Sequence, residues 1–205
     1  MSFPLDSPAR LAVFASGRGS NLRSLLAAFP PEHPLGSVCS VVSNKAEAGA
    51  LSYAQDEGVP AHFIPFGKNR AGFETAAARL LETEHIDLIC LAGFMRVLSG
   101  QFVNRYAGRI LNIHPSLLPR FPGLRPQQQA LAAGVSESGC TVHFVDAGVD
   151  TGPVILQRRV PVYPEDDAGT LSARILRAEH AAYREAVRLV LEGKVSINSS
   201  AEVQR

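Results

Sequence analysis

Apolar runs and amphipathic stretches alternate along the first two thirds of the chain. Continuous apolar runs predict buried strands at 11–15, 38–42, 62–64, 86–92 and 110–114. Apolar residues at helical spacing predict helices between them, at 20–29, 46–57 and 70–84. The third of these helices carries an apolar face formed by Phe73, Ala77, Leu80 and Leu81. Strands that alternate with helices predict a parallel sheet with helices on both of its faces.

The pattern changes in the last third of the chain. Two apolar stretches, 139–145 and 154–160, are separated only by a turn rich in glycine and aspartate, which favours an antiparallel strand pair added to the sheet. A long helix is predicted at 170–192, followed by a frayed tail from Ser196. No repeat, linker or low-complexity segment divides the sequence. We therefore expect an α/β fold, a three-layer Rossmann-like mostly parallel sheet with an antiparallel C-terminal strand pair. It forms a single domain over 1–205, with short flexible tails at about 1–8 and 196–205.

Composition narrows the class of protein. A hydrophobic content of 46% with 19% charged residues is typical of a folded globular chain. The net charge of +1 provides no general attraction to nucleic acid or to a membrane surface, so we expect neither as a partner. The widely spaced Cys39, Cys90 and Cys140 are predicted to be reduced, buried thiols. No basic region followed by an apolar core opens the chain, and a cytoplasmic protein is expected.

The most informative polar residues stand at the end of the 110–114 strand. Asn112 and His114 are two residues apart, so their side chains point to the same side of a strand, and Pro115 ends the regular ladder directly after them. An amide donor beside a titratable ring suits the stabilisation of a developing oxyanion. A polar strand end capped by a turn explains the same residues. The segment by itself leaves both interpretations open.

A glycine-rich stretch, residues 16–22 (here the glycine turn), joins the first strand to the first helix. Its glycines permit a sharp turn, and the free amides of the helix start attract an anion such as phosphate. A dinucleotide site would have a third glycine at position 22, which is Leu22, and an acidic residue after the second strand, where Ser43-Asn44-Lys45 stands. A phosphate monoester is therefore favoured over a dinucleotide, although the turn by itself can be purely structural.

Other polar residues carry weaker signals. Asp150 lies in a segment of ordinary turn formers, and a carboxylate there could alternatively orient a histidine and hold its proton. His143, within an apolar strand, is more typical of a core histidine than of a catalyst, and Glu179 with His180 could be surface residues. Arg96 follows the most apolar strand, either as a solvated loop residue or at the ligand-binding end of the sheet.

Taken together, these segments resemble the phosphoribosylglycinamide formyltransferase family, folate-dependent enzymes of purine biosynthesis. The resemblance covers roughly residues 9–194 in the family's order. The matching motifs are Ser16-Gly17-Arg18-Gly19-Ser20-Asn21-Leu22, Ser43-Asn44-Lys45, Leu91-Ala92-Gly93-Phe94-Met95-Arg96-Val97-Leu98, Leu111-Asn112-Ile113-His114-Pro115-Ser116-Leu117-Leu118-Pro119, Pro122-Gly123-Leu124 and Asp150-Thr151-Gly152-Pro153-Val154-Ile155.

The resemblance implies a formyl transfer from 10-formyltetrahydrofolate, the co-substrate, to the amine of glycinamide ribonucleotide, with no metal. It implies that Asn112, His114 and Asp150 are catalytic, and that Gly19, Ser20, Asn21 and Glu179 bind the ribonucleotide. The implied folate-binding residues are Arg70, Met95, Arg96, Val97, Leu98 and Asn112. In the implied mechanism Asn112 and a protonated His114 stabilise the oxyanion, and Asp150 keeps His114 protonated. Both partners are small molecules, and a homodimer is left open.

One stretch departs from the family pattern. Many members carry histidines after Pro122-Gly123-Leu124, whereas this chain has Arg125-Pro126-Gln127-Gln128-Gln129, which puts a substrate or loop-closure role of these positions in doubt. Related enzymes are the nearest alternative, either a formyltetrahydrofolate hydrolase or a methionyl-tRNA transferase. Each of these carries an additional domain, which we do not expect in this chain. A non-catalytic nucleotide-binding module would be expected to have lost one of Asn112, His114 and Asp150, and all three are present.

Overall fold

The computed structural model describes residues 3–5, 7–67, 70–197 and 203–204. In this part of the chain the main sheet has seven strands in the order β3-β2-β1-β4-β5-β6-β7. The first five in the chain are parallel, and their bounds are β1 Ala9–Phe14, β2 Gly36–Ser43, β3 Ala61–Phe63, β4 Leu88–Leu91 and β5 Ile110–His114. The chain builds β1, β2 and β3 in one direction and then returns to the other side of β1 to form β4 and β5. The prediction of a parallel sheet is confirmed.

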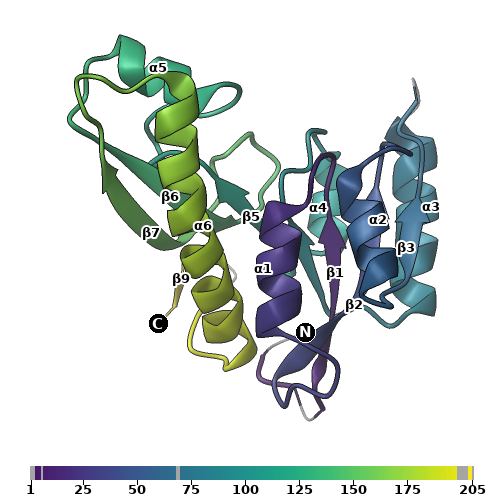
Figure 1. The fold of residues 1–205 in the computed structure, drawn as a ribbon. Helices are drawn as coiled ribbons and strands as arrows, with labels where there is room; N and C mark the ends of the chain where they lie inside the picture. The colour runs from purple at the N-terminus through teal and green to yellow at the C-terminus, as the bar shows by residue number, and fades with distance from the viewer. Residues whose placement is uncertain (1–2, 6, 68–69, 198–202, 205) are drawn as a thin grey trace.

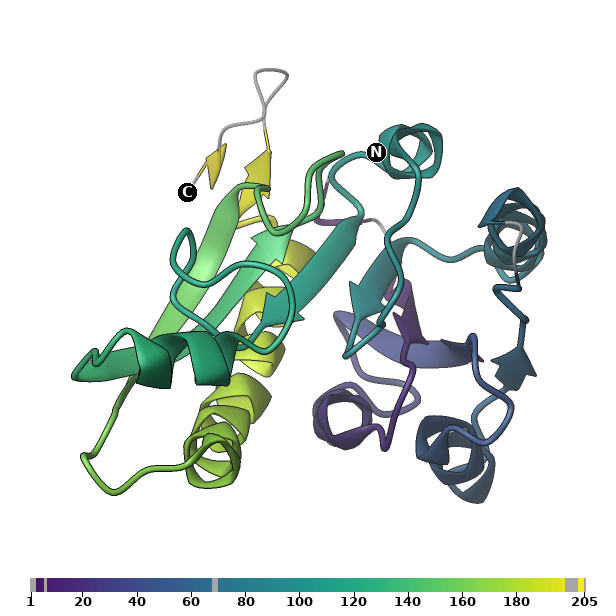
Figure 2. The same cartoon turned by 90° about the horizontal axis from the view of Figure 1, so that it is seen from above.

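Helices cover both faces of this sheet, as Figures 1 and 2 show. On one face lie α1 (Ser20–Ala28), α2 (Gly49–Asp56) and the long α6 (Ala168–Leu191), with α5 (Pro126–Ala132) packed beside α6. On the other face lie α3 (Arg70–Thr83) and α4 (Gly100–Arg105). The predicted three layers are therefore present.

Each face of the sheet has its own core because side chains alternate along a strand. On β1, Leu11 and Val13 face α1, α2 and α6, whereas Ala12 and Phe14 face α3 and α4. The apolar face predicted for α3 packs as expected, since Phe73 is buried against Phe14 with ring centroids 6.2 Å apart. Both cores meet at β4, which is buried along its whole length.

The antiparallel part of the sheet is also confirmed. Strand β6 (Glu137–Phe144) runs antiparallel to β5 and to β7 (Val154–Pro161), which forms the edge of the sheet. In the described residues of the tail expected from Ser196, β8 (Ser196–Ile197) pairs with β9 (Val203–Gln204). The remainder of that tail, with residues 1–2 and 6 of the other expected tail, lies outside the described residues.

Other differences are small. Helices α4 and α5 were not predicted, because each is shorter than two full turns of apolar pattern. Helix α2 begins at Gly49 rather than at the predicted position 46. At this start the amide of Ala50 donates to the carbonyl of Gly17 in the glycine turn. Cys39 is half-buried, although the sequence predicted a buried thiol, and Cys90 and Cys140 are buried as expected. Within the described residues no helix has the length and apolarity that crossing a membrane requires.

Candidate active site

The carboxyl ends of the five parallel strands meet at one edge of the sheet. Strand order reverses between β1 and β4, and in open α/β sheets the crevice at such a reversal is where ligands bind. The glycine turn leaves β1 at this edge, residues 93–98 leave β4, and Asn112 and His114 end β5. The predicted polar segments are therefore neighbours in space although they are far apart in sequence.

A cluster of four polar side chains forms at the end of β5. The Asp150 carboxylate lies 3.2 Å from Nδ1 of His114 and 3.8 Å from Nε2 of His143. Nδ2 of Asn112 lies 3.2 Å from Nε2 of His143 and 3.5 Å from Oδ1 of Asp150. The structure thus brings Asn112, His114 and Asp150 together. The contact between Asn112 and Asp150 joins residues that are 38 positions apart in the sequence.

Hydrogen-bond chemistry defines where protons sit on His114. Its Nε2 lies 2.9 Å from the carbonyl oxygen of Phe121, which can only accept, so Nε2 carries a hydrogen. Its Nδ1 faces Oδ2 of Asp150, which already accepts from the amide of Gly123 at 2.8 Å. An ionised carboxylate also only accepts, and the arrangement therefore suits a doubly protonated imidazolium paired with Asp150.

His143 belongs to the cluster, which the sequence did not predict. Its Nδ1 donates to the carbonyl of Phe144 at 2.7 Å, which leaves Nε2 as the acceptor for the amide of Asn112. Burial lowers the pKa of His143, against the raising effects of the Phe144 carbonyl and of Asp150. The neutral ring is the form that can accept from Asn112. The feature that identifies His143 is the antiparallel pairing of β5 with β6, which sets Asn112 opposite His143.

The turn between β6 and β7 holds Asp150 in place. Asp150 has a φ of +56°, a left-handed conformation that aspartate tolerates better than most residues. Asp146 stabilises the turn by accepting from the amide of Gly148 and from the hydroxyl of Thr151. At Gly152 a Cβ atom would lie 1.9 Å from the carbonyl oxygen of Phe144, so only glycine fits there. The turn formers of this segment therefore serve both the turn and the placement of a carboxylate.

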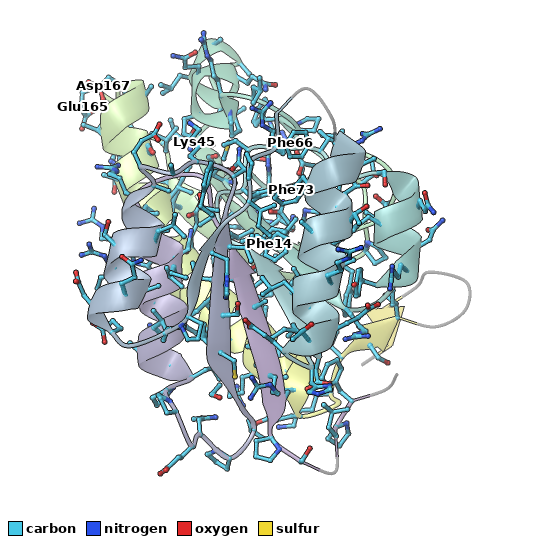
Figure 3. All side chains as sticks on the ribbon, turned by 90° about the vertical axis from the view of Figure 1, so that its right-hand side faces the viewer. Phe14, Lys45, Phe66, Phe73, Glu165 and Asp167 are labelled. Atoms are coloured by element: carbon cyan, nitrogen blue, oxygen red, sulfur yellow. The ribbon has the colours of Figure 1, made fainter. Side chains whose placement is uncertain are left out.

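A pocket of about 400 Å³ opens beside this cluster. Its lining combines the cluster with the segment 95–98 (here the pocket segment) and with residues of the 123–127 loop. The guanidinium of Arg96 lies 4.9 Å from the ring centroid of Phe66, within the range of a cation–π contact. Figure 3 shows Phe66 at the upper end of the molecule, with Phe73 and Phe14 below it towards the sheet. The pocket segment is thereby joined to the core beneath α3.

Arg70 occupies a different place from the other predicted folate-binding residues. Among the described residues that line the pocket, Met95, Arg96, Val97 and Leu98 are present and Arg70 is not. Arg70 is the first residue of α3, and its Nε lies 4.0 Å from Glu74. Glu74 in turn accepts hydrogen bonds from the amide and the hydroxyl of Ser99, directly after the pocket segment.

The glycine turn is backed by helix α6. Gly19 has a φ of +80°, and a Cβ there would lie 2.9 Å from Cα of Ala50, so the turn passes against the start of α2. Ser20 Oγ lies 2.9 Å from Nε2 of His180, and Asn21 donates to Glu179 at 2.7 Å. The alternative of Glu179 as a surface residue is therefore wrong, because only 6% of it is exposed.

Glu179 carries an unusual charge environment. Burial raises the pKa of its carboxyl, and the hydrogen bond from Asn21 opposes that shift. Burial also lowers the pKa of His180, with Arg184 acting in the same direction. Oδ1 of Asn21 is buried and has no hydrogen-bond partner among the described residues. A buried carboxyl group and a buried amide oxygen thus lie together at the start of α1.

The loop that departs from the family pattern is well tied to the cluster. Arg125 precedes α5 in a left-handed conformation, with Pro126 at the first helical position. Nε2 of Gln129 donates to the carbonyls of Pro122 and Leu124. Gln129 therefore has a structural role in shaping the loop next to Asp150.

Comparisons with known proteins agree with this fold and site. A model of the formyl transferase family matches residues 9–187. The fold, the cluster and this match define the class, and the chain belongs to the formyl transferase family. Phosphoribosylglycinamide formyltransferase of Escherichia coli is 40% identical over 193 residues, which make up 93% of this chain and 91% of that protein. Within the formyl transferases, the chain accordingly belongs to the phosphoribosylglycinamide formyltransferases.

Two further relatives extend the comparison. The crystal structure of phosphoribosylglycinamide formyltransferase from Anaplasma phagocytophilum has a TM-score of 0.89 at 42% identity, covering 96% of this chain and 94% of that one. The trifunctional purine biosynthetic protein adenosine-3 of Bos taurus is 46% identical over 197 residues. The match covers 95% of this chain and 20% of that protein, so the chain spans about a fifth of the trifunctional relative.

Proposed function

We propose that this protein transfers the formyl group of 10-formyltetrahydrofolate to the amine of 5′-phosphoribosylglycinamide, in purine biosynthesis. The observation that carries the proposal is the Asp150–His114–Asn112 cluster, which lines a pocket at the strand-order reversal, beside a turn suited to phosphate. The names of the relatives that the chain matches over nearly its whole length support the same activity.

His114 and Asp150 supply charge in this proposal. Acyl transfer to an amine develops negative charge on the carbonyl oxygen, and a fixed positive charge in a site of low water content stabilises it. His114 is 5% exposed, and its Nδ1 lies 3.2 Å from Oδ2 of Asp150, which suits the protonated ring that the proposal requires. Since both of its N–H groups already have acceptors, His114 acts by its charge, and it can donate to substrate once the Phe121 carbonyl is displaced.

Asn112 supplies a directed donor. Its Nδ2 has one contact at 3.2 Å with His143 and a second at 3.5 Å with Asp150, which is longer than an ordinary N–H···O bond. The second N–H is therefore held weakly and is free to turn to the formyl oxygen. His143 sets the orientation of this amide and is a positioning residue.

The ribonucleotide is placed at the glycine turn. The first amides of α1, with Gly19, Ser20 and Asn21, suit the phosphate group because helix N-termini attract anions. Glu179, buried behind them, suits the hydroxyl groups of the ribose. This places the amine of the substrate towards the end of β5.

The folate is placed in the pocket, against Met95, Arg96, Val97 and Leu98. When bound it supplies the formyl group and receives a proton on the departing nitrogen. Arg70 lies beyond the pocket's lining, and its positive charge suits the outer, anionic end of the folate. No group of the chain has to form a covalent bond to the substrate in this scheme. The free cysteines suit a reducing compartment, and a cytoplasmic location is part of the proposal.

Turnover with defined substrates tests the proposal. The protein is mixed with 10-formyltetrahydrofolate and glycinamide ribonucleotide, and the absorbance of the folate product is followed. We expect turnover that requires both substrates. Product formed without the ribonucleotide would show a hydrolase instead, and no product with either would contradict any folate chemistry at this site.

A further inference from the structure

Ser16 lies between the two proposed substrate sites and has no role in the chemistry described above. It is the first residue of the glycine turn, directly beyond β1, and is 3% exposed. Its hydroxyl accepts a hydrogen bond from the amide of Met95 at 2.8 Å, and its own amide donates to the carbonyl of Gly93 at 3.1 Å. Ser16 therefore bonds to Met95, the first residue of the pocket segment, and to Gly93, two residues before it.

Asn44 completes this connection. It follows β2, is 8% exposed, and accepts the hydroxyl hydrogen of Ser16 on Oδ1 at 2.6 Å. With that hydrogen donated to Asn44, the oxygen of Ser16 presents its lone pairs to the amide of Met95. The chain of bonds from Asn44 through Ser16 to Met95 thus joins the ends of three strands, β2, β1 and β4.

The segments joined in this way have little regular structure of their own. The pocket segment lies between β4 and α4 and belongs to no helix or strand. Hydrogen bonds from a buried side chain are the means by which such a segment keeps one position. The carbonyl of Gly17 in the glycine turn accepts a hydrogen bond from the amide of Ala50 in α2, which fixes the other side of the turn.

We propose that Ser16 and Asn44 are positioning residues that set the distance between the bound ribonucleotide and the bound folate. This inference rests on the proposed function, because it assigns the glycine turn to one substrate and the pocket segment to the other. Formyl transfer needs the amine and the formyl carbon in near-attack geometry, and a misplacement of about 1 Å can cost about 10²-fold in rate. Neither residue has to touch a substrate to have this effect.

Ser16→Ala tests the proposal. We expect kcat to fall by about 10²-fold, while the Kd of each substrate, measured separately by calorimetry, changes little, because each half-site stays intact. Ser16→Thr keeps the hydroxyl and should restore most of the wild-type kcat. If Ser16 had a purely structural role, Ser16→Ala would instead lower the melting temperature and weaken the binding of both substrates, without a selective loss of kcat.

Ser40→Ala is the matched control. Ser40 lies on β2, is fully buried, and its hydroxyl has no hydrogen-bond partner among the described residues. The loss of this hydroxyl should leave kcat unchanged. The control thereby separates the effect of the Ser16 hydrogen bonds from the effect of removing any buried hydroxyl. An equal loss of kcat in Ser40→Ala would overturn the proposal, as would a Ser16→Ala enzyme with wild-type kcat.

Asn44→Ala tests the second residue. It should lower kcat by a smaller factor, and adding it to Ser16→Ala should cause no further loss, since both act through one hydrogen bond. If the two substitutions lowered kcat independently, so that their factors multiplied, the hydrogen bond between Asn44 and Ser16 could not be the common cause. If Ser16→Ala does not fold, the Asn44→Ala variant tests the proposal alone. A wild-type kcat in that variant would contradict the proposal. A wild-type protein without turnover would contradict the proposed function itself, whereas an active wild type with unaffected variants would contradict only this inference.

Discussion

Both ring nitrogens of His114 face acceptors. Nε2 lies 2.9 Å from the Phe121 carbonyl and Nδ1 lies 3.2 Å from the Asp150 carboxylate, the arrangement that the proposed function uses. Asp150 is in turn fixed by the amide of Gly123. In the proposed function the histidine is an electrostatic stabiliser rather than a nucleophile. The loop at 121–123 bonds to both members of the pair and defines their geometry.

Asp150→Asn should remove most of the activity. The amide keeps the size of the side chain but not the charge that opposes His114, and we expect kcat to fall by about 10²–10³-fold, the usual cost of losing a charge-stabilising group. Ribonucleotide affinity, measured by calorimetry, should be retained because Glu179 and the glycine turn are separate. Asp56→Asn, on an exposed position of α2, is the control and should behave as wild type. Comparable turnover in Asp150→Asn would contradict the assigned role.

Glu179→Gln should stabilise the free protein and weaken ribonucleotide binding. Burial raises the pKa of Glu179 above its ordinary 4.5, so the ionised carboxylate costs stability at high pH, and a neutral amide does not. The gain in melting temperature over wild type should be larger at pH 8 than at pH 5, because a raised pKa makes the cost of the ionised carboxylate fall as the pH decreases. Thermal unfolding at both pH values measures it.

The control for this charge effect is Glu185→Gln. Glu185 lies on the same helix, but it pairs with Arg158 at the surface and its side chain is 35% exposed. It should show no gain in stability that grows with pH. A Glu179→Gln protein that is less stable than wild type at pH 8 would show that the carboxylate is satisfied in the fold, contrary to the expected cost.

At the scale of elements, helix α6 connects the two halves of the sheet with the glycine turn. Its start is fixed by Asp167, whose side chain accepts from the amide of Thr170 while the Thr170 side chain accepts from the Asp167 amide. One turn of the helix carries Glu179 and His180 to the glycine turn. The next turn carries Tyr183 to Leu91 at the end of β4 and to Leu111 within β5. The helix therefore sets the position of α1 relative to β4 and β5.

Tyr183→Phe should lower stability. The hydroxyl of Tyr183 is fully buried and donates to the carbonyls of Leu91 and Leu111, at 3.0 and 3.2 Å. Losing a donor to buried carbonyls costs about 1–3 kcal/mol, and each kcal/mol lowers the melting temperature by about 2–4 °C in a chain of this size. Scanning calorimetry measures the change.

Tyr106→Phe is the matched control for that substitution. Tyr106 follows α4 and is 5% exposed, and its hydroxyl is buried without a hydrogen-bond partner among the described residues. Its removal should leave the melting temperature unchanged or raise it, because burying a polar group without a hydrogen-bond partner costs free energy, and the substitution removes that cost. Equal destabilisation by both substitutions would mean that the two hydrogen bonds of Tyr183 contribute nothing specific.

At the scale of the whole molecule, the fold buries titratable groups and so makes stability depend on pH. Burial lowers the pKa of both His143 and His180 below the ordinary 6.5. As the pH falls below about 6.5, the unfolded chain takes up protons at these positions before the folded protein does. The free energy of unfolding should therefore decrease from pH 7 towards pH 5.5.

Urea unfolding of wild type, His143→Gln and His180→Gln across this range tests the expectation. Each glutamine should remove part of the dependence on pH, because it cannot take up a proton. Glu179 contributes in the opposite sense, since its raised pKa makes stability fall as the pH rises above 4.5. The differences between variants and wild type isolate the histidines. Equal slopes in all three proteins would contradict the expected contribution.

The sequence by itself determined the elements whose signal is local. Alternating apolar runs and helical spacing predicted the parallel half of the sheet, and β5 was predicted with its observed bounds because Pro115 ends it. The pairing of β6 with β7 also followed from a short turn. The residue types in Asn112, His114 and Asp150, with the family resemblance, pointed to acyl-transfer chemistry before any geometry was available.

Only the tertiary structure decided which of these residues meet. The pairing of β6 with β5 sets His143 opposite Asn112, a contact across 31 residues that no local pattern encodes. The neighbouring of β1 and β4 likewise brings Ser16 to Met95. Burial, which shifts the pKa of Glu179 and of His143, exists only once the layers have packed. Local pattern fixes the side chains an element offers, whereas long-range packing fixes their partners and their charge.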